Sequence, residues 1–361
     1  MDKKLKFIFF NVGQGDATLI EFPTGEFMLI DNKNGGKINV REYLKDILPK
    51  KNDKPFLNYF LLTHAHIDHV GSVNELFGEF EIGEVWYTGF EFKKTEQEKL
   101  PDQYKQFLDE IEKRKKKYSD WDIAVSSKTI LEKSVGEVKF EFMAPPSREE
   151  WEILKKKPEV ASYLKELEEA AKKSKDKNLS DLIHVGSVVG RITYMGSAVL
   201  ITGDSELLSW KFWIIPNFSK YCPARLLHAS HHGSKGFFIS NADSDKEEPF
   251  NEKTEGCFTG GLLAISPQIV VITNNTKPGQ KDHQSPPNKY AIALYEKFKD
   301  TKRDVLFTSD GSIKYVIPDN AISDPKIDEE KKYQNSDSEK SRILYERPVR
   351  ASTGFTSKYG N

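Results

Sequence analysis

The sequence predicts an α/β fold with an αββα layout, in which each half of the chain contributes strands flanked by helices. Short apolar segments separated by Gly and Pro turns occur before residue 90 and again from residue 187, a pattern that is typical of strands. Segments whose apolar residues follow helical spacing lie between and beside these strands. The predicted first half has strands at residues 5–10, 17–22, 27–31, 56–62 and 84–87 and helices at residues 39–48 and 72–77.

The middle of the chain, from about residue 91 to residue 180, differs in composition because Lys and Glu dominate and Gly is scarce. Two helices are predicted there, at residues 103–118 and 148–173, separated by strands near 128–143. Lys/Glu helices are typical of a solvated surface. A lid or a phosphate-contacting arm is the alternative, since the basic cluster Arg114–Lys117 lies here. The interleaved acidic residues favour the solvated surface.

The second half returns to strands and ends in a charged tail. We expect one domain over residues 1–317, with residues 91–180 as a helical insertion within it, and an irregular charged tail over residues 318–361. The predicted strands of this half cover residues 187–194, 198–203, 224–229, 268–273, 304–308 and 312–316, and its helix covers residues 287–299.

Composition limits the class of protein. The 54 basic and 55 acidic residues nearly cancel, so a globally basic nucleic-acid binder is not indicated, although a local basic face stays open. The only cysteines, Cys222 and Cys257, cannot build a disulfide framework or a cysteine metal site. No stretch approaches the roughly 20 apolar residues of a membrane-spanning helix. We therefore expect a cytoplasmic protein without a membrane partner.

One short stretch, Thr63-His64-Ala65-His66-Ile67-Asp68-His69, directly follows the strand predicted at residues 56–62 and holds three of the eight histidines. His64 and His66 are two residues apart, so in extended chain their rings leave on the same side. Asp68 and His69 follow where the chain must turn. Zinc accepts imidazole and carboxylate ligands, and manganese or iron tolerate them. The stretch predicts two adjacent divalent ions, one held mainly by His64 and His66 and the other by Asp68 and His69.

Asp204 follows the strongly apolar segment Ala198–Ile201. A carboxylate at this position would be costly to bury unpaired and needs a cation or hydrogen-bond donors. Two metal ions roughly 3.5–4 Å apart also need a bridging carboxylate. We therefore expect Asp204 to bridge the two ions, and the alternative is an N-cap for a helix that starts near Ser205.

Five segments, in order along most of the chain, carry a resemblance to a known family. The stretch His64–His69 resembles the His-x-His-x-Asp-His signature of the metallo-β-lactamase-fold hydrolases. Four other segments resemble those of the subgroup that includes the nuclease domain of ComEC-type DNA-uptake proteins: Phe9–Ala17, Leu29–Asp31, Leu200–Asp204 and Ser230–Ser234. The resemblance implies an αββα sandwich of the metallo-β-lactamase type and a metal-dependent hydrolase with two divalent metal ions, zinc first and manganese as the alternative.

The resemblance adds candidate ligands in the second half. His231 and His232 can both reach the site only if the chain turns, which Gly233 permits, and at least one is expected to be a metal ligand or a phosphate contact. His283 lies where the family often has Gly-His-Pro and is expected to be a ligand or substrate contact, with an exposed loop histidine as the alternative. His184 is similar to a third histidine of the first metal in glyoxalase-type relatives. Otherwise it is a loop histidine, and the first metal stays more open.

The metal ligands alone do not choose a substrate, since the same kind of site serves esters, thioesters, lactams and phosphodiesters. The subgroup favours a phosphodiesterase or nuclease that acts on DNA or another phosphodiester through a metal-activated water. Asp68 would ligate metal and orient the nucleophile, and His231 or His232 would be an extra donor, so these three are the predicted catalytic residues. The alternatives are a thioester, lactone or lactam hydrolase and a metal-binding sensor or assembly subunit that acts with a partner protein.

Overall fold

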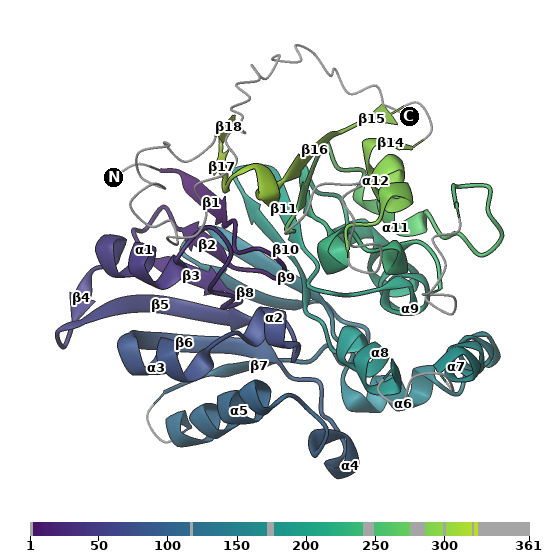
Figure 1. The fold of residues 1–361 in the computed structure, drawn as a ribbon, viewed down its shortest axis with the longest axis horizontal. Helices are drawn as coiled ribbons and strands as arrows, with labels where there is room; N and C mark the ends of the chain where they lie inside the picture. The colour runs from purple at the N-terminus through teal and green to yellow at the C-terminus, as the bar shows by residue number, and fades with distance from the viewer. Residues whose placement is uncertain are drawn as a thin grey trace.

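Two β-sheets lie face to face, and helices cover the outer face of each (Figure 1). The computed structural model describes residues 3–115, 118–171, 177–240, 249–274, 286–298, 301–319 and 321–323. No helix in these ranges combines the length and the apolar character that a membrane crossing needs.

The first sheet collects the N-terminal strands and the last two strands described. It contains β1 (Leu5–Phe9), β2 (Thr18–Glu21), β3 (Phe27–Ile30), β4 (Lys50–Lys51), β5 (Lys54–Leu62), β6 (Glu81–Thr88), β7 (Trp121–Ile123), β17 (Ile313–Ile317) and β18 (Ala321–Ser323). Their order is β18-β17-β1-β2-β3-β5-β6-β7, with β4 paired to β5. Because β5 runs parallel to both β3 and β6, it lies in the interior of the sheet.

The second sheet is built from the later strands in the order β16-β13-β12-β11-β10-β9-β8. These strands are β8 (Leu131–Val135), β9 (Val138–Ala144), β10 (Val189–Tyr194), β11 (Ser197–Ile201), β12 (Leu226–His228), β13 (Ile269–Ile272) and β16 (Asp304–Phe307). A separate short pair joins β14 (Lys297–Phe298) to β15 (Thr301–Lys302). β11, β12 and β13 are parallel neighbours, so their carboxyl ends meet at one edge of the sheet.

The helices divide between the two outer faces. In Figure 1, α1 (Val40–Ile47), α3 (Val73–Glu79) and α5 (Asp102–Arg114) cover the first sheet, and α9 (Leu207–Ser209), α11 (Gly260–Ile265) and α12 (Lys289–Glu296) cover the second. The remaining helices are α2 (Ile67–Val70), α4 (Lys94–Gln97), α6 (Arg148–Leu154), α7 (Pro158–Ala171), α8 (Lys177–Val185) and α10 (Ile215–Phe218), which a π-helical turn at Trp210–Ile214 joins to α9.

Alternating side chains hold these layers together. On β1, Phe7 and Phe9 belong to the buried cluster between the sheets, whereas Ile8 belongs to the cluster under the helices. On β5, Leu61 faces the other sheet and Phe60 faces the helices. This period of two places one row of each strand between the sheets. The second sheet contributes Phe140, Phe142, Ile192, Val199, Ile201, Leu226 and Val271 to the cluster between the sheets. The predicted αββα layout is confirmed.

The prediction of a single helix over residues 148–173 is wrong, because the structure has two helices there. α6 ends at Leu154, and α7 begins with Pro158. Proline has no backbone N–H and clashes with the preceding turn, so it can begin a helix but not continue one. Six further α-helices of the described residues, α2, α4, α8, α9, α10 and α11, were not predicted.

The basic cluster that begins at Arg114 is tied to the fold. Arg114 is buried, and its guanidinium donates to both carboxylate oxygens of Asp120 at 2.7 and 2.9 Å and to the carbonyls of Ile82 and Gly83. Lys115 pairs with Glu112 on the surface. The arginine therefore anchors α5 to the first sheet. Residues 116 and 117 lie outside the described residues.

The predicted domain boundaries remain predictions. β7, β8 and β9 fall between residues 91 and 180 and belong to the sheets, and β18 lies beyond residue 317. Most of the predicted tail lies outside the described residues.

Replacing Leu61 with alanine tests the packing between the sheets. Leu61 is completely buried, so Leu61→Ala should lower the free energy of unfolding by about 2–5 kcal/mol through lost burial and a cavity. The control is Ile153→Ala on α6, where the side chain is 51% exposed and the effect should stay within about 0.5 kcal/mol. Urea unfolding of both variants measures the difference, and equal losses would contradict this description of the core.

Candidate metal centre

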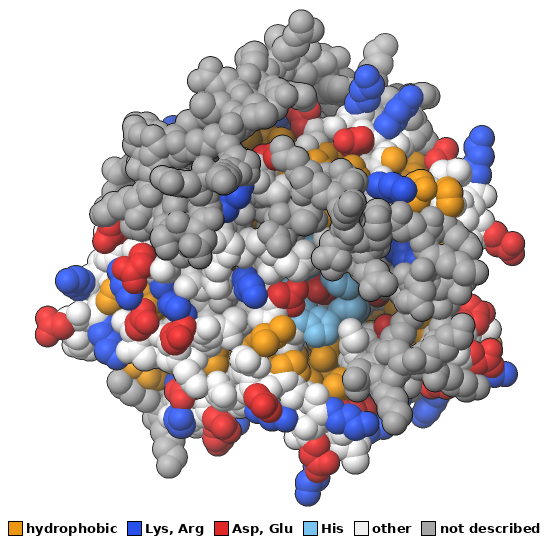
Figure 2. All heavy atoms as spheres, viewed as in Figure 1, with side chains coloured by type: hydrophobic (Ala, Val, Ile, Leu, Met, Phe, Trp, Pro, Cys, Tyr) orange, Lys and Arg blue, Asp and Glu red, His pale blue; other side chains and the backbone are white. Residues whose placement is uncertain are grey.

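Histidine and aspartate side chains from both sheets meet where β5, β11 and β12 end. His64 follows β5 and its Nε2 lies 3.4 Å from Oδ2 of Asp204, which follows β11. His231 and His232 follow β12 in a short helical turn at Ser230–Gly233. Figure 2 shows histidine and acidic side chains together near the middle of this face of the molecule. The site therefore lies across the junction of the two sheets.

Two glycines let the backbone close around the metal-binding stretch. A Cβ on Gly15 would lie 2.3 Å from the carbonyl oxygen of Asp68, and a Cβ on Gly71 would lie 1.9 Å from that of Asn32. Both glycines have positive φ, at 122° and 59°, which other residues rarely adopt. Backbone hydrogen bonds from Asp16 N to Asp68 O and from Asn32 N to His69 O then join the three loops. The glycine-rich motif near residue 13 thus positions the metal-binding stretch.

Asp204 is the centre of the site. Its carboxylate is 1% exposed, and Oδ1 accepts no hydrogen bond from the described residues. Two ligands of one tetrahedral ion, with bonds of about 2.0–2.2 Å, lie about 3.3–3.6 Å apart. The nitrogens around Asp204 scatter about that separation and therefore fit ligands of a shared cation. They are His69 Nε2 at 3.2 Å, His64 Nε2 at 3.4 Å, His231 Nε2 at 3.7 Å, His66 Nδ1 at 3.8 Å and His232 Nε2 at 3.9 Å.

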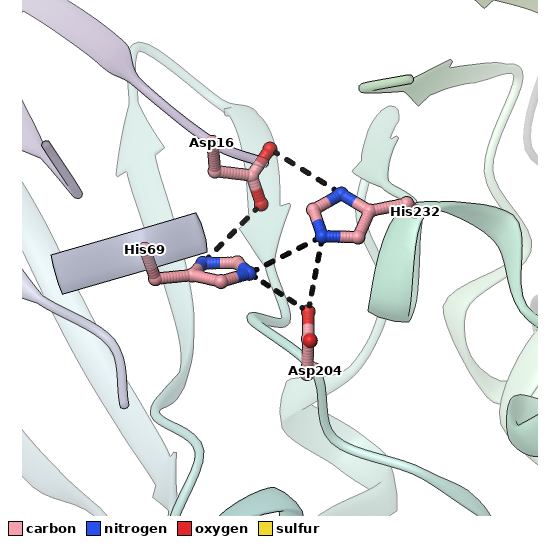
Figure 3. A group of neighbouring side chains, drawn as sticks. All are labelled: Asp16, His69, Asp204 and His232. Carbon is pink, nitrogen blue, oxygen red and sulfur yellow. Dashed lines mark hydrogen bonds and ion pairs between the residues drawn. The ribbon is translucent and has the colours of Figure 1, made fainter. Parts of the chain in front are cut away.

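One set of donor atoms consists of Asp16, His69, Asp204 and His232, whose side chains point toward one another (Figure 3). All four are buried, and their ligand atoms lie within 4.8 Å of one another. They come from the loop before β2, from α2, from the end of β11 and from the turn after β12. The Oδ2 atom of Asp68 lies 3.4 Å from His232 Nε2, at the edge of the same set.

The hydrogen bonds of His69 and His232 leave two lone pairs facing each other. His69 Nδ1 donates to Asp31 Oδ2 at 2.8 Å, and His232 Nδ1 lies 3.1 Å from the hydroxyl of Thr273. When both Nδ1 atoms carry the protons, the two Nε2 atoms present lone pairs across 3.3 Å. Acceptors in this arrangement need a cation between them. The buried partners of Nδ1 are the usual outer contacts of metal-binding histidines.

A second set of donor atoms consists of His64, His66 and Asp204. His64 Nε2 lies 3.2 Å from His66 Nδ1, and the other nitrogen of His66 lies 3.4 Å from the hydroxyl of Ser180 on α8. Because Asp204 belongs to both sets, it occupies the position of a bridging carboxylate. The two sets fit a dinuclear metal site.

His184 and His231 lie on the far side of Asp204 and share a carboxylate partner. Glu206 Oε1 accepts a hydrogen bond from His231 Nδ1 at 2.7 Å, and Glu206 Oε2 lies 3.3 Å from His184 Nδ1. Ligand atoms of His184, His231 and Asp204 also lie within 4.8 Å of one another. His184 belongs to α8 rather than to a loop or a strand entry.

The electrostatics of the site favour cations. Burial raises the pKa of Asp204, but the positive charges of His69 and His231 lower it well below its usual value. Burial likewise raises the pKa of Glu206, and its contacts with His184 and His231 lower it. Burial lowers the pKa of His231, but Asp204 and Glu206 raise it to about 9. The carboxylates thus stay ionised and hold positive charge beside them.

The turn at His231 and His232 differs from the expected one. Both histidines adopt left-handed backbone conformations, with φ of 47° and 52°, and Gly233 follows with φ of 78°. The chain therefore turns at the histidines themselves. Non-glycine residues reach this region at a cost in conformational energy, and such strain clusters at functional sites.

The structure brings together His64, His66, Asp68, His69, His184, Asp204, His231 and His232 among the residues predicted for the site. His283 lies outside the described residues. The ligand and catalytic roles of these residues remain predictions. Asp204 does not cap the next helix, because Glu206 occupies the position before α9.

Sequence reasoning missed several partners. Glu206 belongs to none of the recognised motifs. Its position two residues after Asp204 was the one signal in the sequence that could have marked it. His228, which ends β12, has no place in the motifs, and its Nε2 lies 3.2 Å from both Asp16 Oδ1 and the Thr273 hydroxyl. Thr273 ends an apolar strand and gave no local signal.

Comparison with known proteins gives a family match for part of the chain and likenesses to solved structures. The sequence profile described as Metallo-beta-lactamase superfamily matches residues 11–147. Igni18, a metallo hydrolase from Ignicoccus hospitalis KIN4/I, is similar in structure, with a TM-score of 0.43, 15% identity and coverage of 86% of this chain and 98% of that chain. CmlA, a diiron β-hydroxylase from Streptomyces venezuelae, has a TM-score of 0.44 and 13% identity and covers 86% of this chain and 54% of that chain. No curated protein sequence matches the chain.

The profile match covers residues 11–147, and the two-sheet sandwich and the buried His/Asp cluster agree with a fold of the metallo-β-lactamase type and with a dinuclear metal site.

Replacing Asp31 with asparagine tests the support of His69. Asp31→Asn keeps the shape of the side chain and removes the charge that holds His69 Nδ1, so metal affinity should fall by about 10–100-fold. Titration of metal-free protein with zinc against a chelator measures this affinity. Asp122→Asn, at an exposed position on β7, is the matched control. Unchanged affinity in Asp31→Asn, with native circular dichroism, would contradict the assigned role.

Proposed function

We propose that this protein is a metal-dependent phosphodiesterase that cleaves DNA or another phosphodiester. The motifs that resemble the ComEC-type nuclease domain support this substrate class, and so does the fit of the donor atoms around Asp204 to two ions. Neither the motifs nor the donor atoms distinguish a protein that acts on an anionic substrate from one that acts on a neutral substrate. The observation that carries the proposal is therefore a cationic side chain at the rim of the site.

Lys33 is that side chain. It follows Asp31 and Asn32, and its backbone N–H donates to Asp16 O at 3.0 Å. A Cβ on Gly15 would lie 2.9 Å from Lys33 Cγ and 3.0 Å from Asp68 Cβ, so the lysine stem packs beside the predicted catalytic aspartate. Within the described part of the chain, no acidic side chain pairs with Lys33. A half-buried lysine without a carboxylate partner suits an anionic group of a substrate.

Two divalent ions bound by these residues would supply a hydroxide nucleophile near neutral pH and would neutralise the charge on the phosphate oxygens. The chain's own residues prepare the site. Asp31 and Thr273 orient His69 and His232, and Glu206 turns His231 so that Nε2 faces Asp204. When it binds no ion, His231 Nε2 can carry a proton and donate it to a substrate oxygen. Lys33 would bind a non-bridging phosphate oxygen and orient the ester for attack.

Cleavage of a model phosphodiester tests the proposed class directly. Protein loaded with zinc or manganese should hydrolyse bis-p-nitrophenyl phosphate and DNA, and the double variant His64→Ala, His66→Ala should lose this activity because one set of donor atoms is removed. Release of p-nitrophenol and gel analysis of DNA give the readouts.

The same metal-loaded protein should be assayed on thioester, lactone and β-lactam substrates. Hydrolysis of one of these without phosphodiester cleavage would overturn the substrate class. No activity on any of them, together with a stable complex with a second protein, would point to the sensor or assembly alternative.

Lys33→Met tests the recognition of an anionic substrate. Loss of a charged hydrogen bond of about 1.5–3 kcal/mol should lower kcat/KM for a phosphodiester by roughly ten- to a hundredfold, mainly through KM. Hydrolysis of a neutral carboxylic ester should change much less. Lys50→Met on β4, an exposed lysine at the outer end of the first sheet (Figure 1), is the matched control. Equal kcat/KM in Lys33→Met and wild type would remove the observation that carries the proposal.

A further inference from the structure

Asp181, His184 and Glu206 form a further cluster of donor atoms beside the dinuclear site. None of the three belongs to the two donor sets of that site, which share Asp204. Asp181 and His184 are three residues apart on α8, so their side chains share one face of the helix. Glu206 approaches from the segment after β11. The ligand atoms of these three residues lie within 4.8 Å of one another. A carboxylate and a histidine three residues apart on a helix have the spacing of the Glu-x-x-His motif that binds metal in some helical bundles, although the carboxylate here is an aspartate.

His184 is the observation that points to a ligand. Its side chain is 8% exposed, and neither ring nitrogen has a hydrogen-bond partner among the described residues. Nδ1 faces Glu206 Oε2 at 3.3 Å without the alignment of a hydrogen bond. This separation matches two ligands of one ion at bonds of about 2.0–2.2 Å. A buried imidazole without an aligned hydrogen bond is costly, and a cation would remove that cost.

The pocket at this cluster has the size of an ion. Its volume is about 20 Å³, and one water needs about 10–15 Å³ by the same kind of measure. No Lys or Arg is among the described residues that line the pocket, which are Tyr163, Leu167, Asp181, His184, Val185, Glu206, Leu208 and Ser209.

We propose that Asp181, His184 and Glu206 bind a third divalent cation, separate from the two ions around Asp204. One nitrogen and two carboxylates suit zinc or manganese. Glu206 also accepts the hydrogen bond of His231 Nδ1 at 2.7 Å. Occupancy of the outer site would therefore fix the carboxylate that orients His231. The proposal does not depend on the substrate, because it concerns metal binding alone.

The experiment counts and locates the ions. Metal-free full-length protein is dialysed against graded free zinc, and in a second series manganese, and bound metal is measured by elemental analysis. Crystals soaked at saturating metal give anomalous difference maps at the metal edge. Asp181→Asn is the test variant because Asp181 lies outside both donor sets around Asp204. Asp109→Asn, an exposed aspartate on α5, is the matched control.

Wild type and Asp109→Asn should bind three ions, with one anomalous peak between Asp181, His184 and Glu206. Asp181→Asn should lose that peak and keep the two beside Asp204. Only two peaks in the wild type at saturation would overturn the proposal, whatever the variant does. Loss of all three ions in Asp181→Asn would also overturn it, because Asp181 would then support the dinuclear site rather than a separate one.

Discussion

The burial of the Asp204 carboxylate is the constraint on which the rest of the site depends. An unpaired buried carboxylate is unstable by several kcal/mol even after the protein relaxes. Protonated histidines could compensate it in part, but not every ring around Asp204 can carry a charge. Burial and the charge of His69 lower the pKa of His64 well below its usual value, so His64 stays neutral. Divalent cations meet the same need without placing protons on adjacent rings.

This constraint explains the way the loops are built. Donor atoms must approach Asp204 from segments as distant as Asp16 and His232, so the loops have to pack backbone against backbone. Gly15 and Gly71 permit that approach, and the left-handed turn at His231 and His232 sends two adjacent side chains toward the same centre. The large side chains between the sheets keep the ends of β5 and β11 at a fixed separation. Packing far from the metal centre therefore sets its geometry.

The parts of this arrangement that the sequence predicted are those with a local signal. The strands of the first sheet are short apolar segments with turn residues between them, and the His-x-His-x-Asp-His spacing is compact, so both could be recognised from a few neighbouring residues. The missed segment at residues 207–218 is apolar on nearly every side, and Trp210 and Trp213 are both buried, so no helical period is visible. Glu206 acquires its role only by meeting His231, 25 residues away. A contact of that kind has no signature in a single sequence.

The same reasoning changes the interpretation of the Lys/Glu-rich middle of the chain. Its composition indicates a solvated surface, and the exposed side chains of α5 and α7 agree with that. Yet the chain returns from this region through α8, which places Ser180 against His66 and His184 beside Glu206. One turn of α8 is enough to form a wall of the site. Only the face of this helix that carries Ser180, Asp181 and His184 has to lie against the site. Differences in this helix between related chains would alter the site's rim without disturbing Asp204 or the strands that carry it.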